Sequence, residues 1–196
     1  MRIQKWEYND KRPKGFSQDH DIQPLAVPFL PLCVSSARSE PTPSPEGVTK
    51  MNRGEKANSL MQEYGSCCSG VLGAFVTELG LEMDTVAGLG RGMAGGIGGL
   101  GHICGAVSGA ILAIGLKTTN KDNIHDMQAG FETMEKVREF VTRFEEQHSS
   151  IICKDLIGCD ISSQEKSAVA MKNGAFANCP KYVESAANIL DEMLNG

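Results

Sequence analysis

Apolar residues recur every three or four positions along most of the chain after Asn52, and almost no stretch alternates apolar and polar residues as a half-buried strand does. This pattern predicts an all-α fold, a compact multi-helix bundle. The Gly/Ala-rich segment is the most apolar, so we expect it to form the central helix. The expected helices cover residues 52–64, 67–79, 84–92, 101–116 and 124–147, a short turn at 153–158, and a last helix from 179 onward.

Residues that begin and end helices frame these segments. Gly65 and Gly80 follow the first two patterns and can adopt the left-handed conformation that ends a helix. Asp84 can cap the third helix through its side chain. Pro180 suits the first turn of the last helix, because its missing N–H would have no partner there.

Each apolar stripe predicts the face that its helix buries. The expected inward residues are Ala57, Leu60, Met61 and Tyr64 of the first helix, and Cys67, Val71, Leu72, Ala74, Phe75 and Leu79 of the second. In the long helix they are Phe131, Met134, Val137, Val141 and Phe144, and in the last helix Val183, Ala187, Leu190 and Leu194.

The first fifty residues differ in composition from the rest of the chain. They hold seven of the eight prolines, which cannot continue a helix, so we expect a disordered tail or leader over 1–50 and a helical domain over 51–196. The apolar run at 22–37 resembles an export signal, but the prolines within it argue against that function. Met51 is an alternative natural start. We therefore expect a cytoplasmic protein, with export as the alternative.

Eleven of the twenty-two glycines lie between Gly88 and Gly115. The run "GLGRGMAG" approaches a dinucleotide-binding fingerprint, but no strand precedes it as that motif requires. Residues 92–116 contain no Lys, Arg, Asp or Glu, and Gly105 and Gly109 form a G-x-x-x-G pair that is common between membrane helices. Because the solidly apolar part spans only 103–116, we expect a buried core helix and no transmembrane span.

Charge and cysteine content direct attention to sulfur chemistry. The net charge is −5 without a basic block, so nucleic acid is not an expected partner. The chain has seven cysteines but no C-x-x-C knuckle and no C-x-x-C-H haem attachment site. Four of them fall one to a helix or helix start and could converge in the folded bundle: Cys67, Cys104, Cys153 and Cys179.

Thiolates bind zinc or iron–sulfur clusters, and a helix N-terminus stabilises a thiolate, as we expect at Cys67 and Cys179. Cys104 shares a face with Ser108 on the central helix, where small neighbours leave room for a metal, another sulfur or another helix. His102 could serve as a ligand or an acid/base. The alternative is that these thiols are core residues, since free cysteine is among the most buried residue types.

Four segments, in their order along the chain, resemble the C_GCAxxG_C_C family of redox-active proteins. They are "KANSLMQEYGSCCSGVLGAF" (56–75), "GHICGAVSGAILAIGLK" (101–117), "FVTRFEEQHSSIICKDLIG" (140–158) and "CPKYVESAANIL" (179–190). The resemblance extends from about Arg53 to Leu194. Its C-G-A-x-x-G element corresponds to Cys104, Gly105, Ala106 and Gly109.

The resemblance implies that Cys67, Cys104, Cys153 and Cys179 are the family's four cysteines, with Cys68 an extra. Cys33 and Cys159 have no counterpart in the family pattern. The chain departs from the family where relatives carry a Phe-Gly-Gly-Gly-like run, because residues 89–92 include the cation of Arg91. The resemblance also implies an association with cytochromes or transporter loci. A related domain beside haem in split-Soret cytochromes implies an iron–sulfur centre, and a redox partner protein is a further expectation.

These observations leave three hypotheses. The first is a redox protein that transfers electrons, or cycles between thiol and disulfide, through the four cysteines, with an iron–sulfur cluster as the expected cofactor. The second is a site for zinc or another soft metal, linked to transport. The third is a helical interaction module, such as a homodimer, without chemistry. A non-enzymatic protein is expected, since no Ser/His/Asp or paired-carboxylate arrangement stands out.

Overall fold

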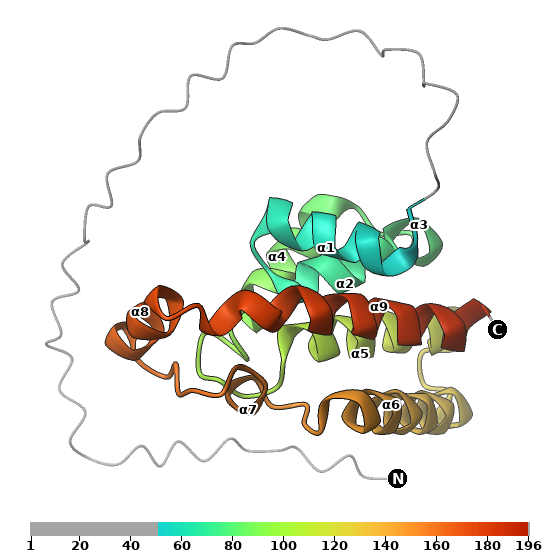
Figure 1. Cartoon of the computed structure of the whole chain (residues 1–196). Coiled ribbons are helices and arrows are strands. Elements are labelled where there is room, and N and C mark those ends of the chain that lie inside the picture. Colours follow the sequence, from blue (N-terminus) through green and yellow to red (C-terminus); the bar gives the residue numbers. More distant parts are fainter. Residues whose placement is uncertain (1–50, 196) are drawn as a thin grey trace, which may run out of the picture. The chain divides into compact units, whose positions relative to one another are not determined.

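The computed structural model describes residues 51–195, and the secondary structure in this range is helical (Figure 1). The bounds are α1 Arg53–Tyr64, α2 Cys67–Ala74, α3 Val76–Leu79, α4 Met83–Met93, α5 Gly105–Thr118, α6 Met127–His148, α7 Cys153–Ile157, α8 Gln164–Lys172, a 3₁₀ turn Ala175–Asn178 and α9 Cys179–Asn195. The all-α fold is confirmed.

Helices α5 and α9 form the middle of the domain. Figure 1 shows α9 crossing in front of α5, with α1 to α4 on one side and α6 and α7 on the other. The contacts agree, since α5 packs on α2, α6 and α9, while α9 also packs on α1 and α6. Most residues of α5 are buried, so the Gly/Ala-rich helix is central as the sequence predicts.

Glycines set the close packing between α5 and α2. A Cβ at Gly109 would lie 2.8 Å from the backbone oxygen of Cys68 and 3.1 Å from the Cβ of Val71. A Cβ at Gly105 would lie 3.2 Å from the Cβ of Cys67. The G-x-x-x-G pair therefore lets two helices of the domain approach until their backbones nearly touch.

Arg53 stabilises the point where the second predicted helix divides. This helix breaks at Phe75, which leaves the carbonyl oxygen of Ala74 free to accept a hydrogen bond of 2.6 Å from the Arg53 guanidinium. The same guanidinium lies 4.5 Å from the centre of the Phe75 ring and pairs with Glu78 and Asp191. One cation thus joins α1, α2, α3 and α9.

Three expected helix ends differ in the structure. The third helix begins at Met83 after Glu82, and Asp84 lies inside its first turn without capping it. The central helix begins at Gly105, so Cys104 is the residue before it rather than part of it. The long helix begins later than expected, at Met127, because the Asp126 carboxylate accepts hydrogen bonds from the next N–H groups.

The predicted face of α6 is buried only in the later turns of the helix. Phe144 is fully buried and Val137 and Val141 pack against the core, together with the unpredicted Phe140. Phe131 and Met134, in the first turns, are about half exposed and lie outside the core cluster. Val183, Ala187 and Leu190 of α9 are buried as predicted, and Leu194 packs at the edge of the core.

Helix α8 has no counterpart in the predicted elements. Only Ala170 of its nine residues is buried, so the apolar repeat that marks a core helix is weak. Ser163 starts this helix by accepting a hydrogen bond from the N–H of Lys166.

Among the described helices, none is long and apolar enough to cross a membrane. The predicted tail, the signal-like segment 22–37 and Cys33 lie outside the described residues, so those predictions remain predictions.

Candidate functional site

Four cysteines that are distant in the sequence line one cavity of about 530 Å³. Cys67 and Cys179 are the first residues of α2 and α9, Cys153 is the first residue of α7, and Cys104 directly precedes α5. Four helix starts therefore meet around the cavity. The sulfur-bearing residues predicted from the sequence are brought together, and the glycine of the central motif, Gly105, lies beside them.

Backbone hydrogen bonds hold Cys104 and Cys153 next to each other. Ile103 and Ile152 form an isolated antiparallel bridge. The N–H of Cys104 donates to the carbonyl oxygen of Ile151 at 2.8 Å, and the N–H of Cys153 donates to that of His102 at 2.6 Å. This pairing fixes the two segments in register, so both cysteines enter the cavity from the same wall.

A left-handed turn, in which four of the five residues are glycine and the fifth is Ile97, packs against this wall. Residues 95–99 all have positive φ angles, from 61° to 80°. Such a run is open almost only to glycine, which accounts for the glycine density before the motif. At Gly96 a Cβ would lie 2.7 Å from the Cβ of Cys153, so this position needs glycine for space as well as for its φ angle.

Cys67 and Cys179 are neighbouring thiols in the cavity, and each shifts the pKa of the other. Sharing a proton with Cys67 lowers the pKa of Cys179. The same sharing, together with burial, raises the pKa of Cys67. The sequence predicts a thiolate stabilised by the helix terminus at both helix starts. At Cys179 the lowering of the pKa comes instead from Cys67, and at Cys67 the pKa is raised by the shared proton and by burial.

The other two cavity thiols are protonated more firmly than an ordinary thiol. Burial raises the pKa of Cys104, against the opposing effect of the N–H groups of Ala106 and Val107. Burial, together with the neighbouring cysteines, raises the pKa of Cys153 to about 12. The site therefore contains one thiol that ionises readily and three that hold their protons.

The rest of the cavity wall is largely apolar and was not predicted. Met61, Leu156, Ile157, Met171 and Phe176 lie on it. Tyr182 also lines it and donates a hydrogen bond of 2.8 Å to the carbonyl oxygen of Leu156. Two of these residues had a sequence signal: Met61 lies on the predicted inward stripe of the first helix, and Tyr182 lies one helical turn after Cys179 on α9.

The remaining candidates lie elsewhere. Cys68 points into the core with no exposed surface, and burial raises its pKa to about 12, consistent with an extra, packing cysteine. His102 and Arg91 are exposed and do not line the cavity. Cys159 lies in a neighbouring pocket.

The thiols are not arranged for a single metal ion. Within residues 51–195, no three His, Cys, Asp or Glu side chains are gathered closely enough to hold one. The six cysteines in this range are all free thiols. The arrangement as it stands is a pair of thiols that affect each other's pKa, Cys67 and Cys179, with two further thiols in the same cavity.

Comparisons with known proteins gave one family. Neither the curated proteins nor the solved structures include a match to this chain. A family model described as "Putative redox-active protein (C_GCAxxG_C_C)" matches residues 65–193, which include all four cavity cysteines. The match covers well over half of the sequence, and the chain therefore belongs to the C_GCAxxG_C_C family of redox-active proteins.

Proposed function

We propose that this protein carries out thiol–disulfide redox chemistry, with Cys67 and Cys179 as the pair that cycles between dithiol and disulfide. The observation that carries the proposal is that the two residues line one cavity and that each is the neighbour with the largest effect on the pKa of the other. A disulfide requires the two sulfurs to approach to about 2.05 Å, which the redox titration below tests directly.

The pKa difference within the pair assigns the two roles. Cys179 has the lowered pKa, so its thiolate attacks one sulfur of an oxidising disulfide and releases the other sulfur as a thiolate. Cys67 then passes its proton to the released thiolate and attacks the Cys179 sulfur of the mixed disulfide. The products are the Cys67–Cys179 disulfide and two thiols, so the pair has lost two electrons and two protons to the oxidant.

The cavity supports this chemistry by its apolar character. Methionine, leucine and phenylalanine side chains surround the pair and limit the access of water, which protects a mixed disulfide from side reactions. Cys104 and Cys153 remain as thiols beside the pair, and their raised pKa values leave less of them as thiolate at neutral pH than of Cys179.

The test is a redox titration of the reduced full chain in buffers of oxidised and reduced dithiothreitol, with disulfides mapped by mass spectrometry. We expect reversible loss of two thiols and a Cys67–Cys179 crosslink. Cys179→Ser should abolish the crosslink, whereas Cys68→Ala, which removes the adjacent core thiol, should leave it unchanged. Persistence of four free thiols in the cavity under oxidising conditions would overturn the proposal.

The cavity itself favours a second candidate, an iron–sulfur cluster bound by Cys67, Cys104, Cys153 and Cys179. Four cysteine thiolates are the usual ligands of such clusters. Because the ligands of a cluster bind several different iron atoms, a cluster accommodates thiols that are further apart than the four ligands of a single zinc ion. When bound, a cluster supplies one-electron transfer. The four cysteines would hold it, and the apolar wall would exclude water from it.

Anaerobic reconstitution with iron and sulfide separates the two candidates. Visible absorption with bound iron and sulfide that is lost in Cys104→Ser, but kept in Cys68→Ala, would support the cluster. Protein that stays colourless and iron-free while forming the Cys67–Cys179 disulfide would reject it. Cys104 is informative because it belongs to the cavity without belonging to the Cys67–Cys179 pair.

A further inference from the structure

Cys159 is placed against Cys153 by the way helix α7 ends. Gly158 has a φ of 73°, its N–H donates to the carbonyl oxygen of Asp155, and the N–H of Cys159 donates to that of Lys154. These two bonds make a Schellman motif, in which the residue after the left-handed glycine folds back on the first turn of the helix. Cys159 accordingly packs against the small apolar cluster of Cys153, Ile161 and Ala170.

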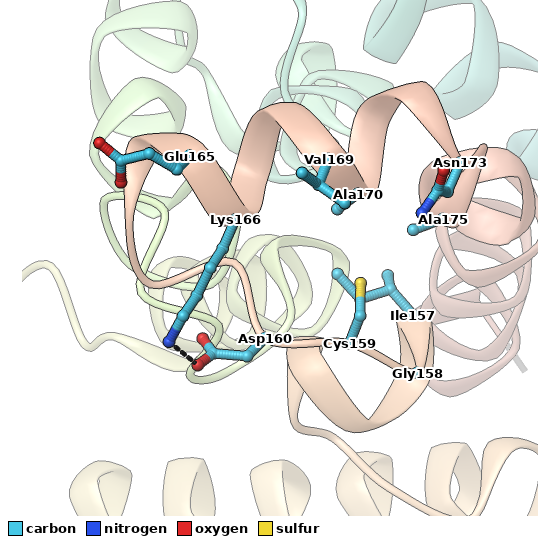
Figure 2. Close-up of a pocket in the computed structure, with 10 residues that line it drawn as sticks. All are labelled: Ile157, Gly158, Cys159, Asp160, Glu165, Lys166, Val169, Ala170, Asn173 and Ala175. Carbon is cyan, nitrogen blue, oxygen red and sulfur yellow. Dashed lines mark hydrogen bonds and ion pairs between the residues drawn. The ribbon is translucent and has the colours of Figure 1, made fainter.

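The two cysteines open onto different cavities. Cys153 lines the four-cysteine cavity, and Cys159 lines a second pocket of about 500 Å³ between α7 and α8. Figure 2 shows the Cys159 sulfur pointing into this pocket, beside Ile157 and beneath Ala170. Ile157 lines both cavities, so a single side chain forms part of the wall between them.

Exposure gives the two thiols different access to reactants. Cys153 is only 7% exposed, so a disulfide from outside cannot reach it without a structural opening. Cys159 is partly exposed, in a pocket with an apolar base and an ion pair of 2.6 Å between Lys166 and Asp160 at its rim (Figure 2). A small-molecule or peptide disulfide that carries polar groups beside its S–S bond fits such a pocket. Its sulfurs would lie at the apolar base and its polar groups beside the ion pair at the rim.

We propose that Cys159 and Cys153 form a second redox pair, which exchanges with an external disulfide in the Cys159 pocket and passes the oxidation to the Cys67–Cys179 pair. This relay rests on the proposed thiol–disulfide function. It gives a role to a cysteine for which the family pattern has no position, and it identifies the substrate chemistry as a disulfide, either of a small molecule or of a peptide.

The relay consists of two thiol–disulfide exchanges, and atoms and electrons balance in each of them. Cys159 attacks the external disulfide as a thiolate and releases one thiol; Cys153 then attacks the Cys159 sulfur, which gives the Cys153–Cys159 disulfide and a second thiol. Next, the Cys179 thiolate attacks the Cys153 sulfur and frees Cys159, and Cys67 attacks Cys179 and frees Cys153. The net result is one external disulfide reduced to two thiols and one Cys67–Cys179 disulfide formed.

The relay requires Cys179 to reach Cys153 across the shared cavity. The two residues line the same cavity, so the second exchange takes place within it. Only the first exchange involves a molecule from outside.

The test compares the reduced full-length wild type with Cys159→Ser and, as a matched control, Cys68→Ala. Each protein is oxidised with oxidised glutathione, with a disulfide-bonded peptide, or with hydrogen peroxide, and the disulfides are mapped over time after acid quenching. For the wild type we expect the Cys153–Cys159 disulfide to form first and the Cys67–Cys179 disulfide to follow.

In Cys159→Ser we expect formation of the Cys67–Cys179 disulfide to be at least tenfold slower with the disulfide probe, and unchanged with hydrogen peroxide. Dependence on Cys159 with glutathione points to a small-molecule substrate, and dependence with the peptide alone points to a protein partner; both support the relay. Equal rates in the wild type and Cys159→Ser with both disulfide probes overturn the relay and leave the proposed function intact. Absence of the Cys67–Cys179 disulfide with all three oxidants overturns the proposed function and the relay together.

Discussion

Replacing Gly96 by alanine tests whether the left-handed glycine turn positions the cavity thiols. Gly96 has a φ of +71°, and a Cβ there would lie 2.7 Å from both the Cys153 Cβ and the His102 backbone nitrogen. These neighbours cannot yield easily, because the N–H of Cys153 is bonded to the His102 carbonyl. Gly98 is the matched control, since its φ of +61° is similar but nothing lies within 4 Å of its Cβ position.

The two substitutions share one cost and differ in another. An L-residue in the left-handed region costs roughly 1–2 kcal/mol, and we expect about that loss of unfolding free energy for Gly98→Ala. Gly96→Ala adds an overpacking cost of about 1–3 kcal/mol, because the methyl group must displace backbone and the Cys153 Cβ. The expected total for Gly96→Ala is therefore about 2–5 kcal/mol.

Urea denaturation followed by circular dichroism measures both losses. Alkylation of native Cys153 by iodoacetamide, quantified by mass spectrometry, gives a second measurement at the site. If the clash opens the wall, Cys153 should react about 5- to 150-fold faster in Gly96→Ala than in Gly98→Ala, which corresponds to the 1–3 kcal/mol difference. Equal stability and equal Cys153 reactivity in the two variants would refute the assignment of the turn as a spacer for Cys153.

Three other sets of substitutions test the packing and the thiol pair. Arg53→Ala should lower the unfolding free energy by about 2–3 kcal/mol in urea denaturation, because it removes a carbonyl hydrogen bond, a ring contact and two partly exposed ion pairs; a loss below about 0.5 kcal/mol would contradict this. Gly109→Ala should lose about 1–3 kcal/mol in the same assay because its Cβ meets the backbone of α2, whereas Gly115→Ala, on the same helix with open space, should gain up to about 1 kcal/mol, and the reverse order would refute the close-packing account. Alkylation of Cys179 should reach half of its maximal rate at a pH below the ordinary thiol pKa of about 8.5, because its lowered pKa leaves more thiolate at each pH, and Cys67→Ala should shift that midpoint upward by removing the thiol that shares its proton; an unchanged midpoint would count against this sharing.

Local signals in the sequence account for most of the helices. Asn52 and Glu55 form a capping box at the start of α1, and Gly65 ends the helix with a φ of 68°. Such ends depend on the residues within one turn, so they can be predicted without the rest of the fold. The break at Phe75 could not be predicted in this way, because the carbonyl that it frees is satisfied by Arg53, which lies about twenty residues earlier.

Burial along α6 shows a second limit of the sequence pattern. Phe131, Met134, Phe140 and Phe144 are equally apolar, but only Phe140 and Phe144 meet the core. The periodicity of a helix identifies its apolar face without showing how far along the helix the neighbouring elements extend. That extent is set by the lengths and positions of α5 and α9, which the amino-acid pattern of α6 does not contain.

The amino-acid sequence alone determined the helical class, the central position of the Gly/Ala-rich segment, and the set of four separated cysteines that mark the family. Residue types and their spacing suffice for these properties, because helix propensity, apolar periodicity and motif identity are local. Only the tertiary structure decided that the four thiols share one cavity, that Cys67 and Cys179 shift each other's pKa, and that Cys159 opens onto a separate pocket. Those relations depend on where helix starts from distant parts of the chain meet, and a thiol's ionisation follows its neighbours in space rather than its position in the sequence.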